Sequence, residues 1–212
     1  MKLGFIGSGG VAQTLGTAFL AKGYEVMLSS RSPEKLDEWK QAAGEKAAAG
    51  TFQDAAKFGD VVFIATPGEA ALDAISLAGK ESFDNKTVID LTNPLDFSKG
   101  APPRFSATVG NSLGEEVQRA LTRAHVVKAF NSIGASIMID PQFDGQAATL
   151  FIAGNNDSAK DTVKKLAEEF GWEVADAGGI DQAFFLEAFA SLWINYAFKH
   201  DQWNQAFKLL VR

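Results

Sequence analysis

The sequence predicts an α/β protein with a Rossmann-like, doubly wound, mostly parallel sheet and a small C-terminal helical portion. Short apolar runs alternate with amphipathic stretches along most of the chain, which is typical of a parallel sheet covered by helices on both faces. A glycine-rich turn follows the first apolar run, in the segment MKLGFIGSGGVAQTLG. The 212 residues are 46% hydrophobic and 22% charged, which is ordinary for a globular protein.

The elements are predicted in the following order. Strands are expected at 2–6, 25–29, 48–51, 61–65, 88–91, 126–129, 150–153 and 173–175, and helices at 10–21, 33–42, 54–58, 69–77, 113–121 and 158–170. Pro33 suits the first turn of its helix, and Ser158 is a candidate N-cap. Residues 92–110 predict a loop, and the aromatic stretch 183–210 predicts two further helices.

Composition excludes several classes of function. The formal charge of −6 argues against nucleic acid or an anionic membrane as the main partner. The absence of cysteine excludes disulfides, thiol nucleophiles and cysteine-ligated metals, and His125 and His200 have no carboxylate cluster near them in sequence, so we predict no metal site. No apolar run approaches the roughly 20 residues that span a bilayer, and a strand begins at Lys2, so the cytoplasm is the expected location.

The glycine-rich turn predicts a dinucleotide site. Gly7-x-Gly9-x-x-Ala12 stands between a predicted strand and a predicted helix. In this pattern the first glycine permits a tight turn, the second lets a pyrophosphate approach the backbone, and a small third residue lets the helix pack on the strand. The helix N-terminus then offers free N–H groups to the phosphates. The alternative is a tight strand–helix turn that binds nothing.

The end of the second predicted strand favours NADP over NAD. An NAD site usually carries an acidic residue there, whereas this chain reads LSSRSPEKL, with Ser30, Arg31, Ser32 and Lys35. Hydroxyl, guanidinium and ammonium donors suit the 2′-phosphate of NADP, although a solvated basic turn is the alternative. We therefore predict an NADP-binding domain at 1–135, and a portion at 136–212 that completes the sheet, the substrate pocket and dimer contacts.

Three further stretches are expected at the same edge of the sheet. In an open α/β sheet the ligand lies outside the carboxyl ends of the strands. The residues that follow strands there are Ala65, Thr66 and Pro67, then Thr92, Asn93 and Pro94, and finally Ala129, Asn131 and Ser132. We predict that they border the ligand, with ordinary loops as the alternative.

Seven segments match one known family in order along nearly the whole chain. They are GFIGSGGVAQTLG, SSRSPEK, DVVFIATP, VIDLTNPL, VVKAFNSIGA, LFIAGNNDSAKDTVKKLAEEFGWEVADAG and LEAFASLWI. The chain thereby resembles the NADP oxidoreductases that work with the 8-hydroxy-5-deazaflavin coenzyme F-420, and their bacterial dinucleotide-binding relatives. The resemblance implies NADP(H) across the strand ends. It also implies hydride exchange between the nicotinamide and a flat deazaflavin or flavin ring beside it.

The resemblance also implies roles for individual residues. Ser30, Arg31 and Lys35 would hold the 2′-phosphate, with Ser32 beside them. Ser8, Gly9, Val11 and Ala12 would line the pyrophosphate, with Gly7 and Gly10 in the same turn. Thr66 and Pro67 would flank the ribose, next to Ala65. Asn93, Ala129 and Asn131 would border the nicotinamide and second substrate, with Asn131, Ser132 and Glu187 in the substrate pocket.

Direct hydride transfer needs alignment of two rings more than it needs an acid or a base. The lack of a Ser–His–Asp set therefore argues against a hydrolase but not against this chemistry. The sequence leaves the catalytic residue unknown. Two other functions stay open: an NADPH-dependent reductase of a small carbonyl, imine or metal chelate, and a non-enzymatic NADP(H) sensor. The apolar C-terminal stretch predicts a homodimer or a tightly docked helix pair, and the expected partner is a small-molecule redox substrate.

Overall fold

The fold is organised around one eight-stranded sheet, and the computed structural model describes all of residues 1–212. The strand order is β12-β11-β8-β5-β4-β1-β2-β3. The strands are β1 (Lys2–Ile6), β2 (Glu25–Ser29), β3 (Ala47–Gly50), β4 (Val61–Ile64), β5 (Thr87–Asp90), β8 (His125–Lys128), β11 (Thr149–Gly154) and β12 (Glu173–Asp176). All neighbours are parallel except β8 and β11, where Lys128 lies opposite Ala153. The predicted mostly parallel sheet is confirmed.

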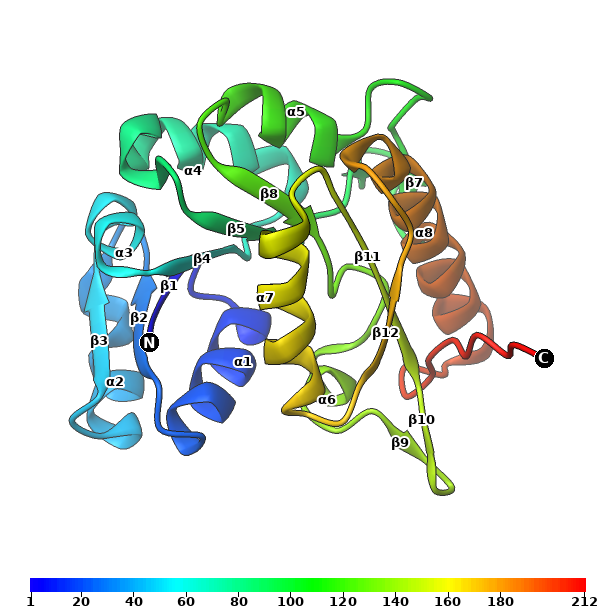
Figure 1. Cartoon of the computed structure of the whole chain (residues 1–212), viewed down its shortest axis with the longest axis horizontal. Helices are drawn as coiled ribbons and strands as arrows, with labels where there is room; N and C mark the ends of the chain where they lie inside the picture. Colours follow the sequence, from blue (N-terminus) through cyan, green and yellow to red (C-terminus); the bar gives the residue numbers. More distant parts are fainter.

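Helices cover both faces of this sheet (Figure 1). On one face α1 (Gly10–Ala21), α6 (Ala135–Met138) and α7 (Asp157–Glu168) contribute to one apolar core. On the other face α3 (Phe52–Phe58), α4 (Ala71–Ala78) and α5 (Leu113–Ala120) bury a second core. α2 (Asp37–Ala43) contacts β3, and the long α8 (Ala183–His200) packs beside β11. This two-sided covering is the doubly wound architecture that the sequence predicts.

Local signals set several helix boundaries. Thr51 and Asp54 form a capping box at the start of α3, and Ser112 and Glu115 form another at the start of α5. In each box the hydroxyl accepts from a backbone N–H of the first turn while the carboxylate accepts from the cap residue's own N–H. Gly79 follows α4 with a φ of 78°, a left-handed conformation that favours glycine at a helix end.

Some predicted elements differ from the observed ones. The stretch 183–210 contains one helix rather than two, because Asp201 adopts a left-handed conformation and ends α8 at His200. The tail then returns without helical structure, and Phe207 O accepts from Thr149 N. Asn156, not Ser158, caps α7, with its Oδ1 accepting from Ala159 N at 2.9 Å. The stretch 33–42 splits into a 3-10 turn and α2.

Two small hairpins also lie outside the main sheet. The predicted loop 92–110 contains β6 (Leu95–Asp96) paired with β7 (Arg104–Phe105), and β9 (Gln142–Phe143) pairs with β10 (Gln146–Ala147). The parallel strands β1, β4, β5 and β8 all end at one edge of the sheet. No helix of the structure combines the length and the apolar character needed to cross a membrane.

Candidate functional site

The turn between β1 and α1 has the geometry of a phosphate-binding loop. Gly7 has a φ of 138°, and a Cβ there would lie 2.4 Å from the carbonyl oxygen of Ala65, so this position requires glycine. A Cβ on Gly9 or Gly10 would meet nothing within 4 Å, so the backbone faces open space. Gly9 is the N-cap of α1 and supplies no side-chain cap. The first N–H groups of α1 are therefore available to an anion.

A groove of about 370 Å³ runs from this turn past the ends of β2 and β4. Its lining includes eight of the thirteen residues predicted to contact the cofactor's phosphates and ribose: Gly7, Ser8, Gly9, Ser30, Arg31, Ala65, Thr66 and Pro67. Gly10, Val11, Ala12, Ser32 and Lys35 are not part of it. The hydroxyl oxygen of Thr66 is buried there without a hydrogen-bond partner. Because an unpartnered buried hydroxyl is costly, this atom fits a site completed by a polar ligand such as a dinucleotide.

The groove also contains residues that the sequence did not single out. Phe52 begins α3, and Glu69 and Asp73 stand four residues apart at the start of the α4 region. Four-residue spacing puts the two carboxylates on one side of a helix, which was readable from the sequence. Their presence in the same groove as Arg31 was not, because it depends on how distant segments of the chain meet in the fold.

The turn after β2 presents cationic groups at one end of the groove. Arg31 and Lys35 are exposed, and Ser30 Oγ accepts from the backbone N–H of Ser32 at 3.1 Å. Neither Arg31 nor Lys35 forms an ion pair with a carboxylate. Arg31 and Ser30 line the groove, whereas Ser32 and Lys35 lie just beyond its lining. The turn thus has uncommitted positive charge where an added phosphate is expected.

At the other end of the site, two asparagine side chains join the loops after β5 and β8. Asn93 Nδ2 donates to Asn131 O at 2.7 Å, and Asn131 Nδ2 donates to Asn93 Oδ1 at 3.0 Å. Asn131 Nδ2 also donates to Leu186 O of α8 at 2.9 Å. These two loops and α8 form what we call the rim. Ala129 is completely buried and Ser132 nearly so, so Ala129 offers the rim no accessible side chain.

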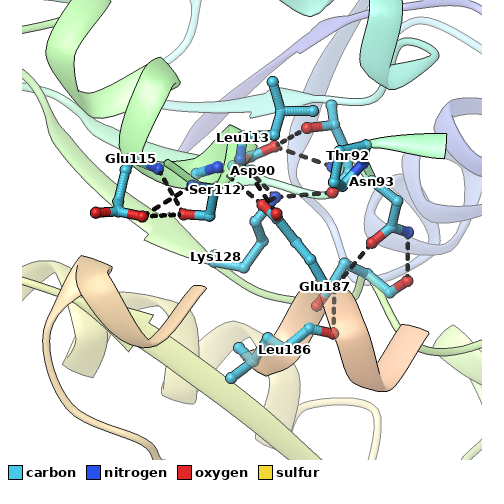
Figure 2. A network of polar contacts seen from close by, with 12 residues as sticks. Asp90, Thr92, Asn93, Ser112, Leu113, Glu115, Lys128, Leu186 and Glu187 are labelled. Carbon is cyan, nitrogen blue, oxygen red and sulfur yellow. Dashed lines mark hydrogen bonds and ion pairs between the residues drawn. The ribbon is translucent and has the colours of Figure 1, made fainter. Parts of the chain in front are cut away.

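Beneath the rim lies a buried cluster of three charged side chains (Figure 2). Lys128 Nζ is 2.7 Å from Asp90 Oδ2 and 2.8 Å from Glu187 Oε1, and all three side chains have no solvent exposure. Burial by itself lowers the pKa of Lys128, but the attraction of Asp90 and Glu187 outweighs it and holds that pKa above its usual value. Lys128 is therefore a permanent cation.

Each carboxylate of the cluster has further partners. Asp90 Oδ1 accepts from Thr92 N at 2.9 Å and from Thr92 Oγ1 at 2.6 Å. Glu187 accepts from Leu113 N at 3.1 Å and from Gly114 N at 2.8 Å, which are free N–H groups at the N-terminus of α5. The prediction that Glu187 lines the substrate pocket is corrected by its complete burial: it supports the rim from below.

The site thus has a strand–turn–helix cradle for a diphosphate, a cationic turn beside it and a rigid polar rim further along. Together with the fold, this arrangement defines the class of Rossmann-type, NADP-dependent oxidoreductases. Comparison with known proteins gives the same class. The model of the family described as "NADP oxidoreductase coenzyme F420-dependent" matches residues 2–94, which include the glycine turn, the cationic turn and Asn93.

Two relatives match along almost the full chain. An "F420-dependent NADP reductase" of Methanocaldococcus jannaschii is 30% identical over 214 residues, covering 94% of each protein. A crystal structure from Arthrobacter sp. FB24, of a chain proposed to be an F420-dependent NADP reductase, superposes with a TM-score of 0.93 and 32% identity over 100% of both chains. The chain belongs to the family of coenzyme F420-dependent NADP oxidoreductases, and it is an NADP-dependent oxidoreductase.

Two other matches are partial. "Metalloreductase STEAP3" of Rattus norvegicus is 31% identical over 190 residues, which are 88% of this chain but 36% of that protein. An imine reductase from Aspergillus terreus superposes with a TM-score of 0.69 at 16% identity, over 94% of this chain and 63% of the other. At that identity the imine reductase shares the fold alone.

Proposed function

We propose that this protein transfers a hydride between NADP(H) and a deazaflavin ring of the coenzyme F-420 type. The observation that carries the proposal is the near-complete match to a protein named F420-dependent NADP reductase, over 94% of both chains. The geometry supports it, because the groove that fits the dinucleotide starts at the glycine turn, and the rim stands at the ends of the neighbouring strands of the same sheet edge.

In this proposal the phosphates and ribose of the cofactor bind at one end of the site, and the nicotinamide binds at the other. The added phosphate binds at Ser30, Arg31, Ser32 and Lys35, and the diphosphate binds the turn from Gly7 to Ala12, including Ser8, Gly10 and Val11. Ala65, Thr66 and Pro67 contact the ribose side, and Thr66 Oγ1 gains the partner that it otherwise lacks. The nicotinamide end lies against Asn93 and Asn131, with Ala129 and Ser132 as backbone neighbours.

The chain's own contribution to the reaction is alignment. When bound, NADPH would supply a hydride from its nicotinamide ring to the acceptor ring, and solvent would supply the accompanying proton. The carboxamides of Asn93 and Asn131 give the rim a fixed shape, because Asn93 Nδ2 donates to the backbone carbonyl of Asn131 while Asn93 Oδ1 accepts from Asn131 Nδ2. Holding two rings in contact geometry accounts for a large part of such a rate enhancement, so no histidine or carboxylate acid is needed in the groove.

The direct test supplies purified protein with NADPH and oxidised coenzyme F-420 and follows both absorbances. We expect equimolar loss of NADPH and of oxidised deazaflavin, and transfer of deuterium from nicotinamide-deuterated NADPH to the deazaflavin carbon. Free FMN serves as a flat-ring control. NADPH binding without any reduction of deazaflavin or flavin would refute the proposal and favour the cofactor-sensor alternative.

A second candidate function is NADPH-dependent reduction of a metal chelate. It is favoured by the 31% identity to Metalloreductase STEAP3, which covers 88% of this chain. The present chain spans about a third of that protein, so the comparison concerns the NADP-binding part. Reduction of a ferric chelate by NADPH without an added deazaflavin or flavin would support this candidate, and a strict requirement for deazaflavin would exclude it.

We further propose that the protein is a homodimer joined through α8. Phe185, Leu192 and Tyr196 are all about half exposed or more, and their spacing of seven and four residues puts them on one side of the helix. A row of exposed large apolar side chains is typical of an interface, and a second copy can pair the same helix by symmetry. Sedimentation equilibrium tests this, and a monomer at all concentrations would contradict it.

A further inference from the structure

We propose that Lys128 is a positioning residue for hydride transfer: its ammonium, held by Glu187 of α8, fixes the exits of β5 and β8, which carry Asn93 and Asn131 to the rim. The inference rests on the proposed function, since it assumes that hydride transfer takes place at this rim. It assigns a role to the charged cluster that lies out of reach of any ligand and therefore takes no direct part in the chemistry.

The exit of β5 is held through Thr92. The N–H and hydroxyl of Thr92 both donate to Asp90 Oδ1, at 2.9 and 2.6 Å. The carbonyl oxygen of Thr92 accepts from Lys128 Nζ at 2.7 Å. Three polar atoms of this one residue are thus bound by the charged cluster, as Figure 2 shows. Asn93 is the next residue, so the position of its carboxamide follows from that of Thr92.

The exit of β8 begins at Lys128 itself. Two residues further on, Phe130 has a φ of 59°, a left-handed conformation that is unfavourable for an aromatic residue. Its ring is completely buried and meets the edge of Trp172 at 6.5 Å between centroids. Backbone strain of this kind persists only where the surroundings enforce it, and it is common at functional sites. The reversal at Phe130 allows the next residue, Asn131, to reach both Asn93 and Leu186.

The helix α8 holds both exits through two consecutive residues. Leu186 O accepts from Asn131 Nδ2 at 2.9 Å, while Glu187 Oε1 pairs with Lys128 Nζ at 2.8 Å. The carboxylate of Glu187 also accepts from two N–H groups at the start of α5. Docking of α8 therefore sets the position of Lys128 relative to α5, and Lys128 sets Thr92. The helix α8 therefore positions the two loops of the rim, although the side chain of Glu187 is buried and touches no ligand.

Stability alone gives a poor reason for such a cluster. Replacing a buried ion network with apolar residues of similar volume is often neutral or stabilising, because taking charges out of water is costly. What apolar residues cannot do is bind a particular carbonyl oxygen and two particular carboxylates at once. For a reaction that depends on alignment, a displacement of the reacting groups by about 1 Å costs on the order of 10²-fold in rate. An ammonium that fixes the loops of Asn93 and Asn131 therefore contributes to the rate rather than to stability.

The experiment compares three single variants with the unmodified protein. Glu187→Gln keeps the size of the side chain and one acceptor oxygen but removes one of the two negative charges that hold Lys128, leaving Asp90. Lys128→Met removes the ammonium. The matched control is Lys160→Met, since Lys160 on α7 also bridges two carboxylates, Asp157 at 3.1 Å and Asp176 at 2.7 Å, but lies away from the rim. Thermal unfolding and gel filtration establish that each variant is folded.

Two measurements separate positioning from a merely structural role. The first is the dissociation constant of NADPH together with the fluorescence anisotropy decay of its bound nicotinamide, which requires no acceptor. The second is the single-turnover rate of hydride transfer with its deuterium isotope effect. We expect Glu187→Gln to bind NADPH within about twofold of the parent protein, to leave the nicotinamide more mobile, and to slow the isotope-sensitive step by about 10- to 100-fold. Lys160→Met should match the parent in all of these.

The inference is overturned if folded Glu187→Gln transfers hydride within twofold of the parent, or if its NADPH affinity falls as far as its rate. If Lys128→Met does not fold, Glu187→Gln decides alone. If the parent protein reduces no deazaflavin, the proposed function fails. The anisotropy of bound NADPH still tests the positioning role in that case, because it reports on the rim without any second substrate.

Discussion

The two ends of the site differ in how they are built. At the glycine turn and the cationic turn, the binding groups are backbone N–H groups and exposed side chains, and Arg31 has no ion-pair partner of its own. At the rim, Asn93 and Asn131 are bound to each other and stand over a cluster of three fully buried charges. The binding groups at the first end, which we call the open end, have no partners in the protein. The polar groups at the second end, which we call the buried end, are already hydrogen-bonded or ion-paired within the protein.

This difference matches two different physical tasks. Phosphate binding is stronger when the cationic side chain has no carboxylate partner in the free protein. An unpaired guanidinium or ammonium can direct its full charge and its N–H donors to the phosphate. Ring alignment gains from groups that do not move on binding, because any reorganisation at the moment of reaction adds to the barrier. Under the proposed function we therefore expect the open end to govern affinity and cofactor choice, and the buried end to govern rate.

The largest expected effect is at the buried end. Lys128→Met leaves Asp90 and Glu187 facing each other without a counter-ion, and breaking a buried pair in this way costs about 3–5 kcal/mol of stability. Lys160→Met removes a lysine with two carboxylate partners at the surface and should cost no more than about 1 kcal/mol. Urea unfolding of both variants measures this difference in the free energy of unfolding. Equal losses would show that the buried cluster contributes no more to stability than the surface one.

The next effect is at the open end. Arg31→Ala should weaken NADPH binding by about 1.5–3 kcal/mol, the value of a lost hydrogen bond to a charged group, and should affect NADH far less. Because the side chain is exposed, stability should hardly change. Isothermal titration calorimetry with both cofactors gives the comparison. Equal losses for NADPH and NADH would mean that the turn after β2 does not recognise the added phosphate.

The difference between the two ends also explains why the sequence predicted the open end but not the buried cluster. The glycine turn and the cationic turn each lie within a few consecutive residues, so their chemistry can be read as a local pattern. The buried cluster comes from Asp90, Lys128 and Glu187, which are distant in sequence. They meet only because β5 and β8 are neighbours and because α8 packs beside β11 and α5. Each is the single charge in an apolar run, as in VIDL, VVKAF and FFLEAF. A charge in such a run predicts a buried partner but does not identify it.

A smaller effect concerns the helices that start beside each end. At the open end the first turn of α3 is capped by the Thr51–Asp54 box alone, so Thr51→Ala should cost about 1 kcal/mol. At the buried end α5 has the Ser112–Glu115 box and, in addition, Glu187 on the N–H groups of Leu113 and Gly114. The Ser112 hydroxyl accepts from Glu115 N, which Glu187 does not contact, and Ser112 is completely buried whereas Thr51 is exposed. Ser112→Ala should therefore cost more than Thr51→Ala, because it leaves a part-buried N–H without a partner. Chemical denaturation ranks the two, and the reverse order would mean that Glu187 compensates for the lost hydroxyl.

The smallest effect is a pH dependence at the same cap. Hydrogen bonds from the Thr51 hydroxyl and backbone N–H hold the pKa of Asp54 below its usual value of 3.8. Because the folded-state pKa is depressed, the stabilisation is complete above the unfolded-state value and disappears as the pH falls from there through the folded-state value. Thr51→Ala removes the hydroxyl's hydrogen bond to the carboxylate but keeps the backbone one, so it should reduce this acid-side loss. The gap in stability between parent and variant should therefore narrow as the pH falls through that range. Denaturation curves at several pH values measure it, and a gap that stays constant with pH would mean that the hydroxyl, not the carboxylate, provides the cap's stabilisation.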